Sequence, residues 1–278
     1  MPWAVSQRAP VLPPHMESDD VVVDIGGIPS GFWTSDTDFR RMIEDRYAGF
    51  LNPFAPVACR FEIQLTSNLH VTDQDVRVFK TGSTWFFERG DFVAQWDPHR
   101  REGWIRQSAN PYSLDSVLRI AHSVLLAMEG GFLLHAASAI RNGRAFLFAG
   151  VSGAGKTTIA GLAPADATVL TDEVSYVRRV DSGYKAYGTP FAGELAQSGA
   201  NSSGPIDTLF LLEKAPSNCI HSVLPRIAAR ALLRHILFFA EDAELVQRVF
   251  DSALEFVSRV KTASLAFQPN AFIWELIR

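Results

Sequence analysis

The chain has 278 residues, of which 47% are hydrophobic and 20% are charged, and its formal net charge is −4. This composition is typical of a globular protein with a sizeable core, and it favours neither nucleic acid nor an anionic membrane as a partner. The two cysteines, Cys59 and Cys219, predict reduced thiols and no disulfide framework or metal cluster. No signal peptide precedes the first strand and no apolar run reaches the roughly 20 residues of a membrane span. We therefore expect a cytoplasmic protein.

The first 112 residues predict a loosely held arm followed by a small β-rich α+β domain. The arm covers residues 1–20, which hold three prolines and little periodicity. A first strand is expected at Val21–Ile25, and a helix follows for which Ser35 is the expected cap. Short alternating segments between Arg60 and Gln107 are typical of an antiparallel meander.

Three tryptophans of this meander leave two interpretations open. Trp85, Trp96 and Trp104 occur on successive predicted strands. Aromatic residues in such positions usually pack in the core or pair across strands, but they can also form a surface on which a ligand stacks.

A long helix is predicted from Pro111, and we place the domain boundary there. Its apolar residues recur at helical spacing up to Met128, and Glu129-Gly130-Gly131 ends it. Residues 21–112 then form the first domain and residues 113–278 the second.

The second domain opens with a predicted hairpin. Phe132–Ile140 and Arg144–Ala149 are apolar, and Asn142-Gly143 between them is a strong signal for a two-residue turn. The second strand leads directly into Gly150–Thr157, which is a complete G-x-x-x-x-G-K-[ST] motif between a strand and a helix.

This motif predicts a phosphate-binding loop. Its glycines allow the backbone to turn closely so that N–H groups face an anion. Lys156 is expected to reach the β- and γ-phosphates, and the Thr157 hydroxyl is the expected Mg²⁺ ligand. The expected nucleotide-binding residues are Gly150, Val151, Ser152, Gly153, Ala154, Gly155, Lys156, Thr157 and Thr158.

Two carboxylates follow the next predicted strand. Thr168–Leu170 ends at Asp172-Glu173, and the carboxyl ends of strands in an open α/β sheet lie beside bound phosphates. Because neighbouring residues on a strand point to opposite faces, these two acids are not expected to share one role. The remaining predicted elements are a hairpin over 174–187, a turn at Gly188–Glu194, a mobile loop at 196–204, a strand at 206–213, helices at 225–239 and 243–260, a strand at 263–267 and a closing helix at 271–278.

These motifs together resemble the catalytic domain of HPr kinase/phosphorylase, and more closely the HPr-kinase-related proteins that include lasso-peptide kinases. The resemblance is carried by Leu134-His135-Ala136-Ala137, the phosphate loop, Thr171-Asp172-Glu173-Val174 and Gly188–Glu194. It covers residues 133–278 and implies an α/β P-loop kinase domain of the HPr-kinase/phosphoenolpyruvate-carboxykinase type, with a mixed sheet. HPr kinases have Asp-Asp where this chain has Asp172-Glu173 and a glycine-rich signature that this chain lacks, which argues against HPr as the substrate.

The resemblance also implies roles for individual residues. Asp172 matches the general base, Glu173 would hold Mg²⁺ together with Thr157, and His135 matches a histidine near the γ-phosphate. Without the resemblance, a histidine such as His135 on an apolar strand is more often a core histidine whose hydrogen bonds are satisfied. Arg226, Arg230 and Arg234 share one face of a predicted helix and are candidates for a transition-state arginine, although an ordinary solvated face has the same pattern.

The expected function is an ATP- and Mg²⁺-dependent kinase whose acceptor is a serine hydroxyl of a peptide or protein. Two alternatives remain open from the sequence: a nucleotide-binding regulator or scaffold with little turnover, and a kinase of a small molecule such as free serine. HPr kinases form hexamers, and a homo-oligomer is one of the open states of this chain.

Overall fold

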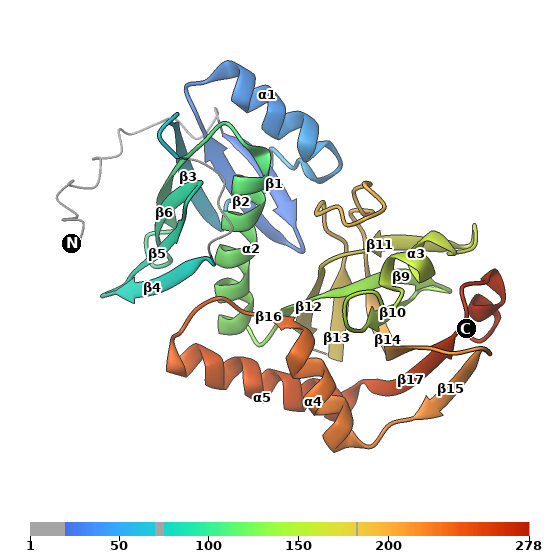
Figure 1. Ribbon diagram of the computed structural model, residues 1–278. Helices are drawn as coiled ribbons and strands as arrows, with labels where there is room; N and C mark the ends of the chain where they lie inside the picture. Colours follow the sequence, from blue (N-terminus) through green and yellow to red (C-terminus); the bar gives the residue numbers. More distant parts are fainter. Residues whose placement is uncertain (1–19, 70–74, 182, 278) are drawn as a thin grey trace.

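The computed structural model, which describes residues 20–69, 75–181 and 183–277, contains two mixed β-sheets with one long helix between them (Figure 1). The protein is therefore of the α/β class. The expected arm at residues 1–20 lies outside the described residues except for Asp20, whose Oδ2 accepts a hydrogen bond from Arg60 Nε at 2.5 Å.

The first sheet has seven strands in the order β1-β2-β3-β7-β6-β5-β4. Their bounds are β1 (Val21–Ile25), β2 (Ile28–Trp33), β3 (Cys59–Leu65), β4 (Arg77–Thr81), β5 (Thr84–Arg89), β6 (Phe92–Asp97) and β7 (Glu102–Gln107). The expected antiparallel meander is confirmed for β4 to β7, whereas β3 runs parallel to both β2 and β7. The sequence showed no sign of this parallel pairing, because residues far apart in the chain form it.

The helix α1 (Thr37–Arg46) begins one residue later than it would if Ser35 were its N-cap. Its N-cap is Asp36, whose side chain accepts hydrogen bonds from the backbone N–H groups of Asp38 at 3.1 Å and Phe39 at 2.8 Å. The assignment of Ser35 as the cap was therefore wrong. Either residue type can satisfy the free N–H groups of a first turn, so the sequence did not discriminate between these neighbours. A short 3₁₀ turn, η2 (Ala48–Phe50), follows α1.

Two of the three tryptophans are core residues. Trp85 and Trp96 lie opposite each other on β5 and β6, and only 1% and 0% of their surfaces are exposed. Trp104 lies half-buried on the other face of the sheet, where its indole N–H donates to Gln95 Oε1 at 3.1 Å. The core interpretation is confirmed for Trp85 and Trp96.

The helix α2 (Pro111–Met128) packs between the two sheets (Figure 1). A fully buried polar chain crosses this junction. His122 of α2 contacts Ser30 Oγ of β2 through Nε2 at 2.8 Å and the Tyr176 hydroxyl of the second sheet through Nδ1 at 2.7 Å. Because a buried polar group needs a partner, this chain fixes the orientation of α2 against both sheets.

The second sheet has ten strands, of which eight follow the order β11-β9-β10-β14-β13-β12-β8-β16 and two, β17 and β15, continue from β14. Their bounds are β8 (Phe132–Leu134), β9 (Ala136–Arg141), β10 (Arg144–Ala149), β11 (Ala167–Thr171), β12 (Ser175–Val180), β13 (Gly183–Tyr187), β14 (Ser203–Lys214), β15 (Cys219–Ser222), β16 (Ile236–Leu237) and β17 (Lys261–Phe267). The expected strand over 132–140 is interrupted at His135: β8 pairs with β12 and β16, whereas β9 pairs with β10 and β11.

The helices of this half are shorter than expected at several ends. They are α3 (Lys156–Gly161), α4 (Pro225–His235), α5 (Ala243–Arg259) and the 3₁₀ helix η3 (Ala271–Glu275). A mobile loop was expected over 196–204, but residues 203 and 204 belong to β14. Ala200 N–H donates to Val169 O of β11 at 3.1 Å, and Gly199 N–H donates to Thr189 O at 3.1 Å. Within the described parts of the chain, no helix is long and apolar enough to cross a bilayer.

Candidate functional site

Three segments that carry polar residues meet at the ends of three neighbouring strands of the second sheet, β9, β10 and β11. Both β10 and β11 are antiparallel to β9, so they run in the same direction and their carboxyl ends lie together. Gly150 follows β10, Asp172 follows β11, and His135 immediately precedes β9. The sequence motifs are thus brought together by strand order, although 36 positions separate His135 from Thr171 in the chain.

The loop after β10 has the tight backbone that its glycines predicted. Gly153 and Gly155 have φ angles of 74° and 106°, which L residues rarely adopt. A Cβ on Gly155 would lie 2.6 Å from Phe267 Cζ, and one on Gly150 would lie 2.6 Å from Ala154 Cβ. The first residues of the loop, Val151 to Gly153, are exposed, while Ala154 is buried beneath them.

Lys156 is the buried cation of this loop. Its Nζ donates to the carbonyl oxygen of Gly150 at 3.1 Å, which closes the loop on itself. Burial lowers the pKa of Lys156, and the nearby carboxylates of Glu173 and Glu194 partly offset this shift. Thr157 is half-buried and Thr158 exposed beside it.

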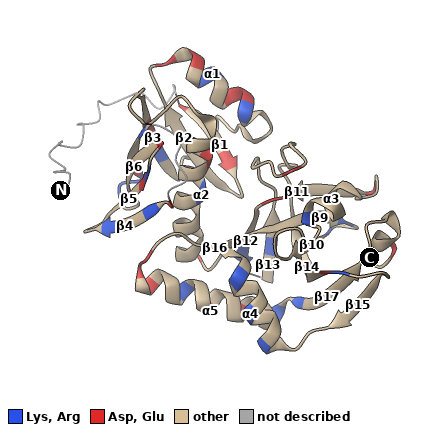
Figure 2. Cartoon of the chain, in the orientation of Figure 1, with Lys and Arg blue, Asp and Glu red and all other residues tan. Residues whose placement is uncertain are grey.

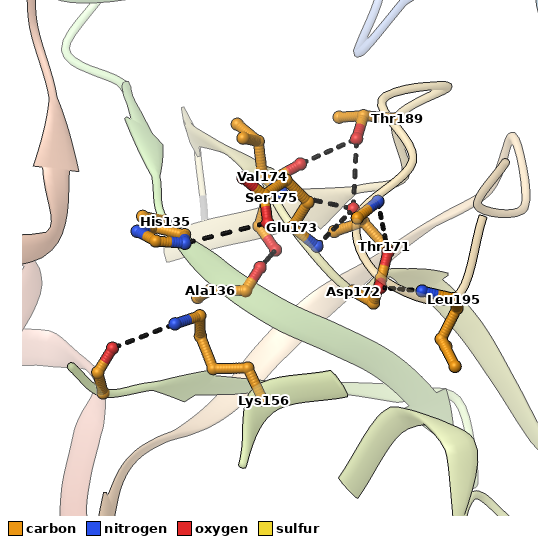
Figure 3. Close-up of polar contacts among 12 residues, drawn as sticks. His135, Ala136, Lys156, Thr171, Asp172, Glu173, Val174, Ser175, Thr189 and Leu195 are labelled. Atoms are coloured by element: carbon orange, nitrogen blue, oxygen red, sulfur yellow. Dashed lines mark hydrogen bonds and ion pairs between the residues drawn. The ribbon is translucent and has the colours of Figure 1, made fainter. Parts of the chain in front are cut away.

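His135 and Glu173 form a second, more open part of the site. His135 Nε2 lies 3.8 Å from Glu173 Oε2, and 35% and 34% of the two side chains are exposed (Figure 3). Burial and the charges of Lys156 and Arg119 lower the pKa of His135, against the opposing effect of Glu173. The imidazole is therefore neutral near pH 7.

Asp172 is not directed toward this pair. Its Oδ1 accepts the Gly193 N–H at 2.9 Å and its Oδ2 accepts the Leu195 N–H at 3.0 Å, and only 2% of the residue is exposed. Figure 3 shows Asp172 turned toward Leu195, while Glu173 points to His135. The two acids point in different directions, and Glu173, not Asp172, is the acid that lies beside His135 and whose charge acts on Lys156.

The site also contains two residues, His235 and Arg119, that the sequence motifs did not predict. The backbone carbonyl of His235, at the end of α4, accepts the His135 N–H at 2.8 Å. The pKa of His235 is lowered by burial and by the charges of His135, Lys156 and Arg234. Arg119 on α2 adds a further positive charge close to His135. Neither His235 nor Arg119 has a local motif that could have identified it.

The expected arginine candidates lie on the surface of α4. Arg226, Arg230 and Arg234 are exposed, and Figure 2 shows basic residues along this helix. Only Arg234 has a charge effect on a group of the site, through His235. Among the described residues, no group of three or more His, Cys, Asp or Glu side chains could hold a metal ion.

The second half of the chain matches a known protein family. The family model of the SynChlorMet cassette protein ScmC matches residues 112–277, which cover more than half of the chain from the start of α2 onward. No curated protein matches the chain. The prediction from the sequence that the chain is a member of the HPr kinase/phosphorylase family was wrong, because the family model that matches is that of ScmC. Similar short motifs around a phosphate loop were not enough to discriminate between families.

Proposed function

We propose that this chain, which belongs to the family of the SynChlorMet cassette protein ScmC, binds ATP and transfers its terminal phosphoryl group to a serine hydroxyl of a peptide or protein. A P-loop kinase fold of residues 113–278, with residues 21–112 as a separate first domain, is part of this proposal. One observation carries it: a glycine-rich loop with a buried lysine lies at the same sheet edge as an accessible carboxylate–imidazole pair. Phosphoryl transfer needs both parts, a charge cradle and a group that orients the attacking oxygen.

The loop fits a triphosphate. Positive φ angles at Gly153 and Gly155 support a loop whose N–H groups turn toward an anion. The missing Cβ atoms at Gly150 and Gly155 let this loop pack closely on Ala154 and Phe267. Lys156 supplies charge at a place where burial makes a cation costly without an anionic ligand. The whole stretch from Gly150 to Thr158 is the proposed phosphate-binding surface.

Glu173 is the proposed proton acceptor for the hydroxyl. It is about one-third exposed and lies beside Lys156, so an acceptor oxygen can reach it next to the phosphates. The imidazole of His135 lies beside this carboxylate, with 3.8 Å between Nε2 and Glu173 Oε2, which is beyond hydrogen-bond distance while the imidazole is neutral. Asp172 acts indirectly, since its two oxygens hold the backbone at Gly193 and Leu195 and so fix the turn that carries Glu194.

A Mg²⁺ ion is also part of the proposal, because hydroxyl and carboxylate oxygens are its usual protein ligands. The Thr157 hydroxyl would hold it beside the phosphates, and Glu173 would be its second protein ligand only if Glu173 does not accept the hydroxyl proton. A bound Mg²⁺ would neutralise charge on the transferring phosphoryl group.

The openness of the site supports a large acceptor. His135 and Glu173 are accessible from solvent, whereas a kinase for free serine would need a pocket that encloses its substrate. A serine displayed on a flexible peptide can enter such an edge without a conformational change of the sheet.

The test is a transfer assay with γ-labelled ATP and Mg²⁺, using peptides and small proteins encoded in the same cassette as acceptors. The wild-type chain should label one acceptor. Glu173→Gln should reduce transfer by roughly 10²–10⁴-fold and leave the affinity for Mg²⁺-ATP unchanged. If Glu173→Gln instead weakens nucleotide binding only in the presence of Mg²⁺, Glu173 is a metal ligand.

Asp172→Asn distinguishes the two carboxylates. If Asp172 only holds the Gly193–Leu195 turn, the variant should keep transfer at temperatures where it remains folded. Loss of transfer with unchanged thermal stability would give the proton-accepting role to Asp172. ATP-dependent thermal stabilisation without transfer to any acceptor would contradict the kinase and favour a nucleotide-binding regulator.

A further inference from the structure

Arg119 of α2 is a half-buried cation that lacks an anionic partner. Its Nε is buried without a hydrogen-bond partner, and among the described residues it forms no hydrogen bond or ion pair. The guanidinium carbon lies 4.5 Å from the centroid of the Phe191 ring. Stacking on an aromatic face orients an arginine but leaves its N–H donors unused.

The path of the chain brings Arg119 level with His135. The chain reverses after α2, where Gly131 N–H donates back to Leu126 O at 2.8 Å, and β8 then packs against α2 within one core cluster. The part of α2 from Arg119 to its end at Met128, at about 1.5 Å a residue, is roughly 14 Å long. The extended chain from Gly131 through β8 to His135, at about 3.3 Å a residue, is roughly 13 Å long.

Two further observations connect Arg119 with the site. Its charge contributes to the lowered pKa of His135, after burial and Lys156. Its stacking partner Phe191 belongs to the turn whose next residues include Gly193, which holds Asp172. Arg119 thus lies at the place where α2, the 188–195 turn and the start of β9 meet.

The chemistry of the free guanidinium suits a phosphoryl group. The planar fork of arginine donates two parallel hydrogen bonds to two oxygens of one phosphate, which lysine cannot do. In the proposed function, Lys156 and the loop bind the anion from one side, whereas Arg119 belongs to α2, outside the loop. The arginines of α4 have no comparable burial, since Arg226, Arg230 and Arg234 are all exposed.

We propose that Arg119 binds the terminal phosphoryl group of the nucleoside triphosphate held by the Gly150–Thr158 loop. This inference rests on the proposed function and adds the cation that distinguishes a triphosphate from a diphosphate. It also gives α2 a role in the site, because the arginine comes from the helix that joins the two sheets.

The experiment compares the full chain with Arg119→Gln, Arg119→Lys and the control Arg100→Gln, which removes an exposed arginine in the β6–β7 turn. Calorimetry measures the binding of ADP and of the non-hydrolysable triphosphate AMP-PNP, each with Mg²⁺, and a melting curve is recorded for every variant. Arg119→Gln should weaken AMP-PNP binding by roughly 10- to 100-fold, as expected for lost hydrogen bonds to a charged group. ADP binding should change less than about threefold in the same variant.

The other variants make the result decisive. Arg119→Lys keeps the charge but not the fork and should fall between wild type and Arg119→Gln, and it carries the test if the glutamine variant melts too low to assay. Arg100→Gln should match wild type. If the Arg119 variants lose affinity for ADP and AMP-PNP equally, or lose affinity for neither, the inference is overturned while nucleotide binding stands. A wild-type chain that binds neither ADP nor AMP-PNP refutes the proposed function and this inference with it.

Discussion

Acidification should destabilise the protein through His122, the residue at the centre of the buried junction between the sheets. His122 is fully buried, and burial lowers its pKa from 6.5 to about 3, with a smaller contribution from the charge of Arg178. In the unfolded chain its pKa returns to about 6.5. The unfolded state therefore binds a proton at pH values where the folded state does not.

The sign and size follow from this difference. Because the folded pKa is depressed, stability is fully present above pH 6.5 and is lost as the pH falls from 6.5 toward 3. With these two pKa values, the contribution of His122 lowers the free energy of unfolding by about 2 kcal/mol at pH 5, by about 4 kcal/mol at pH 3 and by about 5 kcal/mol well below pH 3. The comparison is best made between pH 7.5 and pH 5, because the carboxyls of Asp91 and Asp97 titrate at lower pH.

The assay is urea unfolding of wild type and His122→Gln at both pH values. Glutamine cannot contact both Ser30 and Tyr176, so the variant should be less stable at pH 7.5 by about 1–3 kcal/mol. The lowered pKa values of His135 and His235 also make the wild type lose stability in this range, but they do so in both proteins. The stability gap between the two proteins should therefore shrink by about 2 kcal/mol at pH 5.

An unchanged gap would refute the reasoning. If both proteins lose the same stability between pH 7.5 and pH 5, His122 either accepts a proton in the folded state or is not enclosed by Ser30 and Tyr176. A gap that widens at pH 5 would mean that the charged imidazole stabilises the junction, which is the opposite sign.

Three further outcomes are expected. Gly155→Ala should lower the free energy of unfolding by about 1–3 kcal/mol and abolish ATP-dependent thermal stabilisation, because its Cβ would meet Phe267. Gly143→Ala is the matched control, since Gly143 also has a positive φ but a Cβ there would lie in open space. Equal loss of ATP-dependent stabilisation in both variants would contradict the packing argument. Asp172→Asn should lower the free energy of unfolding by about 1–3 kcal/mol in urea titrations, since an amide presents N–H where a backbone N–H also points; no loss would mean that these hydrogen bonds do not hold the turn. Trp96→Ala should lower the free energy of unfolding by about 3–5 kcal/mol, because the side chain is fully buried, and should leave the affinity for ATP unchanged. A loss of ATP affinity in the folded variant would show that the first sheet contributes to the nucleotide site.

Local patterns in the sequence were enough for several parts of the molecule. The phosphate-loop motif, the Asn142-Gly143 turn and the apolar stripe of α2 each depend on residues a few positions apart. The structure has a tight loop, a hairpin and a helix at these places. Such features are encoded by backbone preferences and by the spacing of apolar side chains, which a short segment expresses without the rest of the chain.

Long-range packing decided the rest. The parallel pairing of β3 with β7, the break of the expected strand at His135 and the early end of α4 at His235 follow from which distant strands become neighbours. The direction of the two acids was decided in the same way, because Asp172 found backbone donors at Gly193 and Leu195 while Glu173 was left facing His135. Arg119 has no motif at all, and its charge acts on His135 because α2 packs on β8. The sequence by itself therefore determined the loop proposed to bind phosphate, and the tertiary structure determined which side chains surround that loop, since these contacts depend on burial and strand order that no local pattern encodes.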